Sequence, residues 1–184
     1  MNITTAENDI EYILFNEEQI KARVTELGAE LAEYYKGTTP VMTGVLNGAS
    51  IFHSDLVRAY KGHLFIDFIQ VSSYGTGTSS SGTITFKKDF GTDIKGKDVL
   101  IVEDIVDSGL TLKYLKEMLK DRGVKSVKTI AFLNKYECHP RELDTDFYGF
   151  KIENNFVVGY GLDYAQHYRN LPYIGVLKKQ VYES

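Results

Sequence analysis

The feature that most constrains this chain lies between residues 99 and 119, where an apolar run leads through a short polar loop into an amphipathic stretch. Residues 99–102 are all apolar and mostly β-branched, which is typical of a strand buried on both faces of a parallel sheet. Leu112, Leu115 and Leu119 then recur at the spacing of one helix face. We therefore predict a strand, a loop and a helix in that order.

The loop between this strand and this helix carries groups that suit a phosphorylated sugar. Glu103 and Asp104 follow the strand directly, and carboxylates bind Mg²⁺ or accept hydrogen bonds from sugar hydroxyls. Free backbone N–H groups at a helix N-terminus favour a phosphate, and Gly109 lets the backbone approach it closely. An ordinary βα turn with solvated acids would explain the loop alone, but the buried strand before it and the amphipathic helix after it favour a ligand site.

Residues 103–111 resemble the phosphoribosyl-pyrophosphate-binding motif of type I phosphoribosyltransferases. Within that family they resemble the hypoxanthine-guanine branch, which has Glu-Asp first and an aspartate at the position of Asp107. The resemblance implies that Asp107 is catalytic and takes or returns the proton at N7 of a purine. It also implies that the phosphoribosyl group and its 5′-phosphate are bound by Glu103, Asp104, Asp107, Ser108, Gly109, Leu110 and Thr111.

A second strand, loop and helix begin at residue 41 and offer another turn at which an anion could bind. A plain βα connection explains this turn equally well. The resemblance implies that backbone groups of Leu46, Asn47 and Gly48 contact pyrophosphate, with a cis peptide bond between Leu46 and Asn47. Family members often have a basic residue where Asn47 stands, so the resemblance supports the backbone contact and not a contact with a charged side chain.

Residues 74–82 consist mostly of glycine, serine and threonine and separate two predicted strands, 64–73 and 83–86. A hairpin tip without function is one interpretation, and a lid is another, because long loops in compact domains are often functional. Ser73 and Tyr74, followed by glycine, match the mobile loop of the family. The resemblance therefore implies a lid that shields the reacting sugar from water.

The C-terminal part carries the residues that the resemblance assigns to the purine and to pyrophosphate. Lys135 ends a predicted strand, which is where ligands bind in open α/β sheets, and the family has a lysine there that contacts the 6-oxygen. Phe156 would stack on the base and the backbone of Val157 would bond its edge, although residues 156–158 alone read as a core strand. The resemblance implies that Mg²⁺ is held by Glu103, Asp104 and Asp163. It implies that the purine is bound by Lys135, Phe156, Val157 and Asp163. It adds Arg169 to the residues that bind pyrophosphate.

Strands that alternate with helices predict an α/β fold, with a twisted, mostly parallel sheet flanked by helices. An early helix should begin at Asn16, which has Gln19 three residues later as a capping partner. We expect one domain over residues 1–184, with a core at about 37–134. Residues 1–15 and 135–184 would form a small hood over the base.

The composition excludes several classes of function. The chain has 184 residues, of which 43% are hydrophobic, and a net charge of −4, so it has no basic field for nucleic acid. One cysteine, Cys138, excludes an internal disulfide and a multi-cysteine zinc site, and we expect it and His139 to lie at the surface. The chain has no apolar run of about 18 residues and no signal-peptide pattern at its start. We therefore expect a cytoplasmic protein without nucleic-acid or membrane partners.

Taken together, the resemblance implies a purine-salvage enzyme that is a homodimer or homotetramer. It would transfer the phosphoribosyl group from phosphoribosyl pyrophosphate to N9 of a 6-oxopurine, hypoxanthine or guanine, with Mg²⁺ as cofactor. A transferase for another base, such as a xanthine-preferring one, stays open, as does a non-catalytic sensor of phosphoribosyl pyrophosphate. Such a regulator usually has a basic face or an added DNA-binding segment, and this chain has neither.

Overall fold

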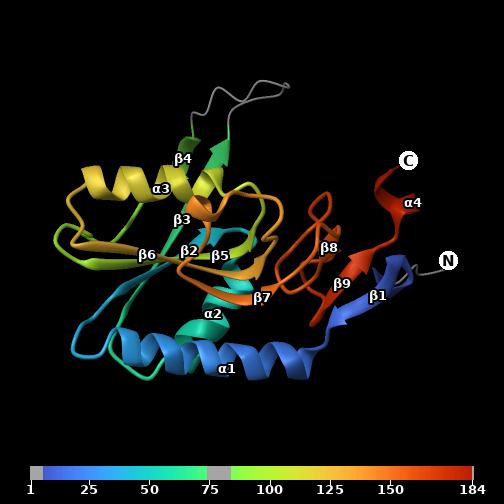
Figure 1. Ribbon diagram of the computed structural model, residues 1–184, viewed down its shortest axis with the longest axis horizontal. Helices are drawn as coiled ribbons and strands as arrows, with labels where there is room; N and C mark the ends of the chain where they lie inside the picture. The colour runs from blue at the N-terminus through green and yellow to red at the C-terminus, as the bar shows by residue number, and fades with distance from the viewer. Residues whose placement is uncertain (1–5, 74–83, 184) are drawn as a thin grey trace.

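A six-stranded, twisted sheet forms the centre of the computed structural model, which describes residues 6–73 and 84–183 (Figure 1). All neighbouring strands run parallel except β3 and β4, which are antiparallel. The prediction of an α/β fold with a mostly parallel sheet is therefore confirmed. In spatial order the strands are β4 (Ile84–Lys88), β3 (Phe65–Ser73), β2 (Val41–Leu46), β5 (Asp98–Val106), β6 (Ser126–Asn134) and β7 (Phe147–Lys151).

A second sheet has three antiparallel strands in the order β1, β9, β8, and it joins the two ends of the chain. Both of the segments that we expected to form a hood contribute to it. The remaining elements of the described chain are η1 (Ala6–Asp9), β1 (Ile10–Phe15), α1 (Glu17–Tyr34), α2 (Ser50–Ala59), α3 (Leu110–Asp121), η2 (Arg141–Leu143), β8 (Val157–Val158), β9 (Ile174–Leu177) and α4 (Lys179–Tyr182).

One boundary differs from the sequence prediction, because β7 lies within the range 135–184 that we assigned to the hood. It pairs with β6 and extends the central sheet instead. Gly149 of β7 leaves room for the backbone of Phe132, where a Cβ would overlap the carbonyl oxygen. The strands β1, β8 and β9, which belong to the two segments expected to form the hood, make up the second sheet. This sheet lies to one side of the central sheet in Figure 1.

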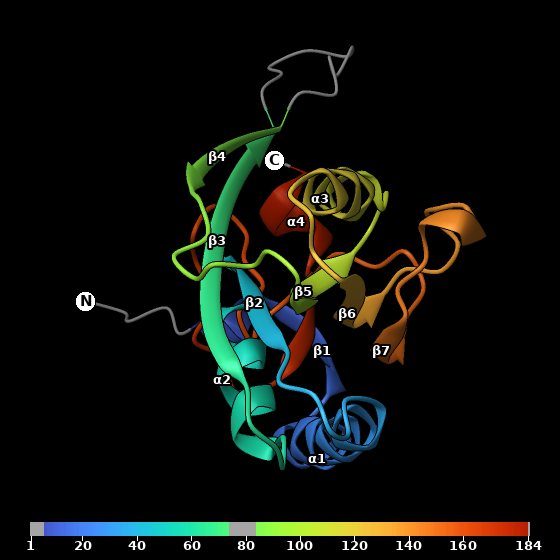
Figure 2. The ribbon, with the colours of Figure 1, turned by 90° about the vertical axis from the view of Figure 1, so that its left-hand side faces the viewer.

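The central sheet is covered by α1 and α2 on one face and by α3 on the other (Figure 2). Alternate residues of β5 divide between the two layers. Leu100 and Val102 pack with α1 and α2, whereas Val99 and Ile101 pack with α3, and all four are fully buried. Burial on both faces explains why this segment is continuously apolar in sequence.

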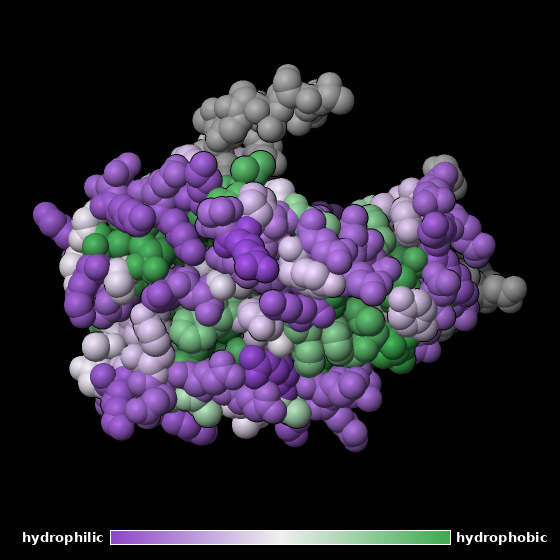
Figure 3. Space-filling model, viewed as in Figure 1, coloured by the Kyte–Doolittle hydropathy of each residue, from purple (hydrophilic) through white to green (hydrophobic). Residues whose placement is uncertain are grey.

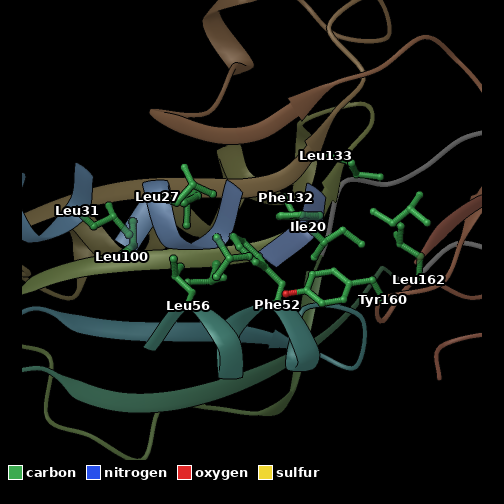
Figure 4. Packing of buried hydrophobic residues seen from close by; sticks show 14 of the residues in the cluster. Ile20, Leu27, Leu31, Phe52, Leu56, Leu100, Phe132, Leu133, Tyr160 and Leu162 are labelled. Atoms are coloured by element: carbon green, nitrogen blue, oxygen red, sulfur yellow. The ribbon is translucent and has the colours of Figure 1, made fainter. Parts of the chain in front are cut away.

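Large apolar side chains fill the space between the sheet and the helix pair α1 and α2 (Figure 4). Leu27 and Leu31 of α1 face Phe52 of α2, and none of the three is exposed. The ring of Phe52 lies 4.8 Å from the ring of Phe132 in β6. This packing fixes α2 against the sheet, and with it the turn that leads into α2.

The surface in Figure 3 is mainly hydrophilic, with apolar side chains gathered over β1 and β9. Tyr12 and Ile13 of β1 are among the exposed large apolar residues, at 47% and 53%. Among the helices that the structure describes, none is both long enough and apolar enough to cross a bilayer.

The predicted start of α1 is confirmed and gives a test of its stability. Asn16 accepts a hydrogen bond from the N–H of Gln19 (2.9 Å), and the Gln19 side chain accepts one from the N–H of Asn16 (2.9 Å). Replacing Asn16 with alanine should lower the free energy of unfolding by about 1 kcal/mol, because an N–H loses its acceptor. Urea unfolding measures this, and Asn16→Ser should keep nearly all of the stability. Equal stability of the wild type and Asn16→Ala would contradict it.

Candidate active site

The carboxyl ends of β2, β5 and β6 meet at one edge of the central sheet, because these strands are parallel neighbours. The turns that follow β2 and β5 lead into α2 and α3, and Lys135 follows β6 directly. Three segments that are far apart in the sequence therefore converge here, and a loop after β8 joins them. This is the edge at which open α/β sheets bind ligands.

The turn between β5 and α3 surrounds a cavity of about 200 Å³. The N–H of Lys113 makes the first bond of the helix, to the carbonyl of Gly109 (3.0 Å), so the preceding N–H groups have no acceptor within the helix. Gly109 has a φ of +74°, and a Cβ there would also lie 2.7 Å from Leu143. The turn therefore needs glycine, and the cavity is lined by Glu103, Ile105, Val106, Asp107, Ser108, Gly109, Thr111 and Leu112.

The acidic pair lies within β5, whereas we expected it just after the strand. Pairing with β6 continues through Val106, but pairing with β2 ends at Val102. The acids are therefore held on one side by the sheet and face the turn after β2 on the other. Tertiary pairing extends the strand beyond what its apolar run predicts.

Both carboxyl groups hold their protons more tightly than usual. Burial first, and then the negative charge of Asp104, raise the pKa of Glu103 well above its usual range. Burial also raises the pKa of Asp104 to about 6, although the N–H of Ile105 donates to its carboxylate (2.9 Å) and partly opposes this shift. Two adjacent acids with raised pKa values form a site that a cation or hydroxyl donors would stabilise.

The turn after β2 packs directly against this acidic pair. The peptide bond between Leu46 and Asn47 is cis, which confirms that prediction. A Cβ on Gly48 would overlap the carboxylate of Asp104, and a Cβ on Gly161 would overlap the carbonyl of Gly48. Glycine at both positions thus allows the acidic strand, this turn and the loop after β8 to touch one another.

Arg169 and Asp163 form an ion pair beside the same loop. One guanidinium nitrogen of Arg169 lies 2.8 Å from the Asp163 carboxylate, and another donates to the carbonyl of Gly161 (2.8 Å). Within the described ranges, no three histidine, cysteine or acidic side chains converge to hold a metal ion by themselves. A Mg²⁺ ion commonly uses one or two protein carboxylates and takes its other ligands from substrate and water. The acids present are compatible with that arrangement.

Lys135 lies beside Asp107, which lines the cavity. The ammonium of Lys135 is 3.5 Å from the Asp107 carboxylate and donates to the side-chain carbonyl of Asn154 (3.1 Å). An ammonium has three N–H donors, so these contacts leave one for a ligand. No sequence pattern singles out Asn154, which lies two residues before Phe156.

Phe156 remains 36% exposed, whereas Val157 beside it is 7% exposed and pairs with β9. The structure therefore leaves an aromatic side chain open at the edge of the site. Ser73 ends β3, and Tyr74 lies outside the described residues, as does the rest of the predicted lid.

The expected surface position of His139 is wrong. Its side chain is only 9% exposed, and one ring nitrogen lies 3.1 Å from the side-chain oxygen of Asn134. Asn134 in turn donates to Asp144 (2.5 Å), so His139 belongs to a small polar network under the loop after β6. Cys138 is partly exposed.

Comparison with known proteins adds an independent line of observation. The sequence matches a family model described as "Phosphoribosyl transferase domain" over residues 13–165. It is 51% identical to the hypoxanthine-guanine phosphoribosyltransferase of Bacillus subtilis over 177 aligned residues. The aligned segment covers 96% of this chain and 98% of the Bacillus subtilis protein. It is 47% identical over 178 residues to the hypoxanthine-guanine phosphoribosyltransferase of Streptococcus agalactiae. That alignment covers 97% of this chain and 99% of the Streptococcus agalactiae protein. A crystal structure of a hypoxanthine phosphoribosyltransferase from Staphylococcus aureus matches with a TM-score of 0.94 and 44% identity, over 99% and 100% of the chains.

The raised pKa of Asp104 predicts that its ionisation destabilises the ligand-free protein. The folded state retains the Asp104 proton to a higher pH than the unfolded state, so this group lowers the stability as the pH rises from about 4 to above 6. Asp104→Asn should therefore raise the free energy of unfolding by at most about 3 kcal/mol at a pH of about 8, and by little at about 4. Urea unfolding at both pH values checks this, with Asp121→Asn on the surface as the control. A gain that is the same at both pH values would contradict it.

Proposed function

The chain belongs to the hypoxanthine-guanine branch of the phosphoribosyltransferase family, and we propose how its residues carry out the reaction of that branch. The enzyme transfers the 5-phosphoribosyl group of phosphoribosyl pyrophosphate to N9 of hypoxanthine or guanine. The products are a nucleoside 5′-monophosphate and pyrophosphate, so the reaction salvages free purines. One observation carries the assignment of roles: Asp107 lines the cavity at the turn before α3, and its carboxylate lies 3.5 Å from the ammonium of Lys135.

The turn before α3 would bind the 5′-phosphate of the sugar. Its backbone N–H groups before Lys113 have no acceptor within the helix, and Ser108 and Thr111 add hydroxyl donors. Gly109 keeps the backbone accessible. The ribose would then lie along β5, where Glu103 and Asp104 can accept hydrogen bonds from its hydroxyls.

The acidic pair also suits a divalent cation, because its two carboxyl groups are buried and destabilise each other when ionised. One or two of the three carboxylates of Glu103, Asp104 and Asp163, which do not converge as a set of three, would hold Mg²⁺, which when bound neutralises negative charge on pyrophosphate. The neighbouring backbone of Leu46, Asn47 and Gly48 would bind the same leaving group. Arg169 uses part of its five donors on Asp163, Gly161 and Gln166, so its remaining N–H groups can contact pyrophosphate.

The base would lie between Phe156 and the pair of Lys135 and Asp107. The remaining N–H of Lys135 donates to the 6-oxygen, and the backbone of Val157 bonds the opposite edge. As N9 forms its bond to the sugar, the proton on N7 becomes acidic, and Asp107 accepts it. Adenine has an amino donor at position 6, which would leave both that group and the ammonium without an acceptor.

Two other functions predict different results in one assay. A transferase for another base, including a xanthine-preferring one, shares the sugar-binding turn, and a non-catalytic sensor would bind phosphoribosyl pyrophosphate without consuming it. Release of pyrophosphate should be measured with hypoxanthine, guanine, xanthine, adenine, orotate and uracil, with and without Mg²⁺. We expect Mg²⁺-dependent release with hypoxanthine or guanine. Release only with another base would support the first alternative, and binding without release would support the second.

We also propose that the enzyme acts in the cytoplasm as a homodimer or homotetramer. The single cysteine is compatible with a reducing compartment. The exposed apolar side chains of β1 offer surface for contact between copies. Light scattering of the purified protein measures the number of subunits.

Asp107→Asn should lower kcat by about 10²- to 10⁴-fold, because the amide cannot accept the N7 proton. The KM values for both substrates should change much less, since asparagine occupies nearly the same volume. Steady-state kinetics measures this, with Asp121→Asn at the end of α3 as the control. A loss of binding as large as the loss of turnover would argue against Asp107 as the base.

Lys135→Met should lower kcat/KM for hypoxanthine by about 10- to 100-fold, because the 6-oxygen loses a charged donor. The KM for phosphoribosyl pyrophosphate should stay near its wild-type value. Asn154→Ala should have a smaller effect in the same direction, since the ammonium loses one of its two fixed contacts. The exposed Lys151 supplies the control Lys151→Met. Unchanged kinetics of Lys135→Met with hypoxanthine would refute the assignment.

A further inference from the structure

The ring of Phe156 is exposed on one side yet has a close aromatic partner on another. The ring of Tyr182 lies parallel to it, with centroids 4.5 Å apart and 16° between the planes. Tyr164 meets the same ring at 84° and 5.6 Å. Because Tyr182 covers one face of Phe156, a base that stacks on this ring has to use surface that Tyr182 leaves open.

Tyr182 is itself held in place by the two ends of the chain. It ends α4, and it packs with Val181 into an apolar cluster that includes Val158 and Leu171. The backbone N–H of Lys178, just before α4, donates to the carbonyl of Asp9 (2.9 Å), and its ammonium donates to the carbonyl of Asn8 (2.6 Å). The C-terminal segment is thus fixed to the N-terminal turn, and both lie at the same end of the molecule in Figure 1.

We propose that Tyr182 is a positioning residue for the purine, because it fixes the ring of Phe156 before the base arrives. This inference rests on the proposed function, in which Phe156 stacks on the base. An exposed aromatic side chain rotates freely, and ordering it on binding costs affinity. The parallel ring of Tyr182 restricts the rotation of Phe156 before the base binds. A stacked aromatic pair contributes about 0.5–1.5 kcal/mol to the conformation that it holds.

A positioning role of this kind affects one kinetic constant more than the others. Among the hydrogen bonds, ion pairs and aromatic pairs of the described residues, none joins Tyr182 to the acidic pair, to Asp107 or to Arg169. Its loss should therefore weaken purine binding while the chemistry and the binding of phosphoribosyl pyrophosphate proceed as before. Tyr182→Ala should raise the KM for hypoxanthine by about 2- to 12-fold, which corresponds to the energy of one aromatic pair.

Steady-state kinetics on the full chain should compare Tyr182→Ala, Tyr182→Leu and Tyr182→Phe with the wild type. Phenylalanine can stack in the same way and should restore the wild-type KM, whereas leucine fills space but presents no flat face and should resemble alanine. Tyr34→Ala, which removes an exposed tyrosine at the end of α1 that has its own aromatic partner, Phe147, is the matched control and should leave the KM for hypoxanthine unchanged. A wild-type KM for Tyr182→Leu or Tyr182→Ala would overturn the inference. So would a lower KM, since it would mean that Tyr182 occupies the place of the base.

A second measurement reports on Phe156 directly and does not depend on turnover. The chain has no tryptophan, so Phe156→Trp introduces a single indole whose fluorescence anisotropy reports its mobility. Adding Tyr182→Ala should lower that anisotropy, and adding Tyr182→Phe should not. Equal anisotropy with and without the aromatic partner would contradict the role of Tyr182. The two proposals fail separately: an inactive wild type refutes the proposed function, whereas an active wild type with unchanged Tyr182 variants refutes only this inference.

Discussion

The structure depends on two adjacent carboxyl groups that are held near the end of β5, between β2 and β6 in the central sheet. Glu103 is almost fully buried, and its pKa and that of Asp104 are raised mainly because burial disfavours their charged forms. Ionising these two buried acids lowers the stability of the ligand-free protein. A bound cation or hydroxyl donors would reduce that loss. We propose that this loss of stability is offset when the site binds the ribose and Mg²⁺, since function often conflicts with folding.

The same constraint explains the close contacts around the acids. Glycine stands at position 48 because a side chain there would meet the carboxylate of Asp104, and at position 161 because a side chain there would meet the backbone of Gly48. These contacts bring the strand, the turn after β2 and the loop that carries Asp163 and Arg169 together at one edge of the sheet. Lys135 lies between Asp107 and Asn154, and we propose that it recognises the purine from there.

Much of this could be predicted from local sequence patterns. The apolar run of β5, the leucine face of α3 and the Asn16 cap depend on neighbouring residues, and each is present in the structure. What failed or was missed depends on contacts between distant segments. Pairing with β6 carries β5 on to Val106, a polar network buries His139, and Asn154 reaches Lys135 only after folding. The roles proposed for Lys135, Phe156 and Val157 came from the family resemblance, because spacing alone predicts a core strand over residues 156–158 and a solvated lysine at a strand end.

The central claim is that the turn between β5 and α3 binds a sugar phosphate while the acids of β5 bind its ribose and metal. A crystal structure of the protein with a purine nucleoside monophosphate and Mg²⁺ tests this most directly. The account predicts the phosphate at the backbone N–H groups that follow Asp107, and the ribose hydroxyls beside Glu103 and Asp104. The molecule also has a larger cavity, of about 600 Å³, between α1 and α2. A nucleotide bound there, with the turn after β5 empty, would contradict the account.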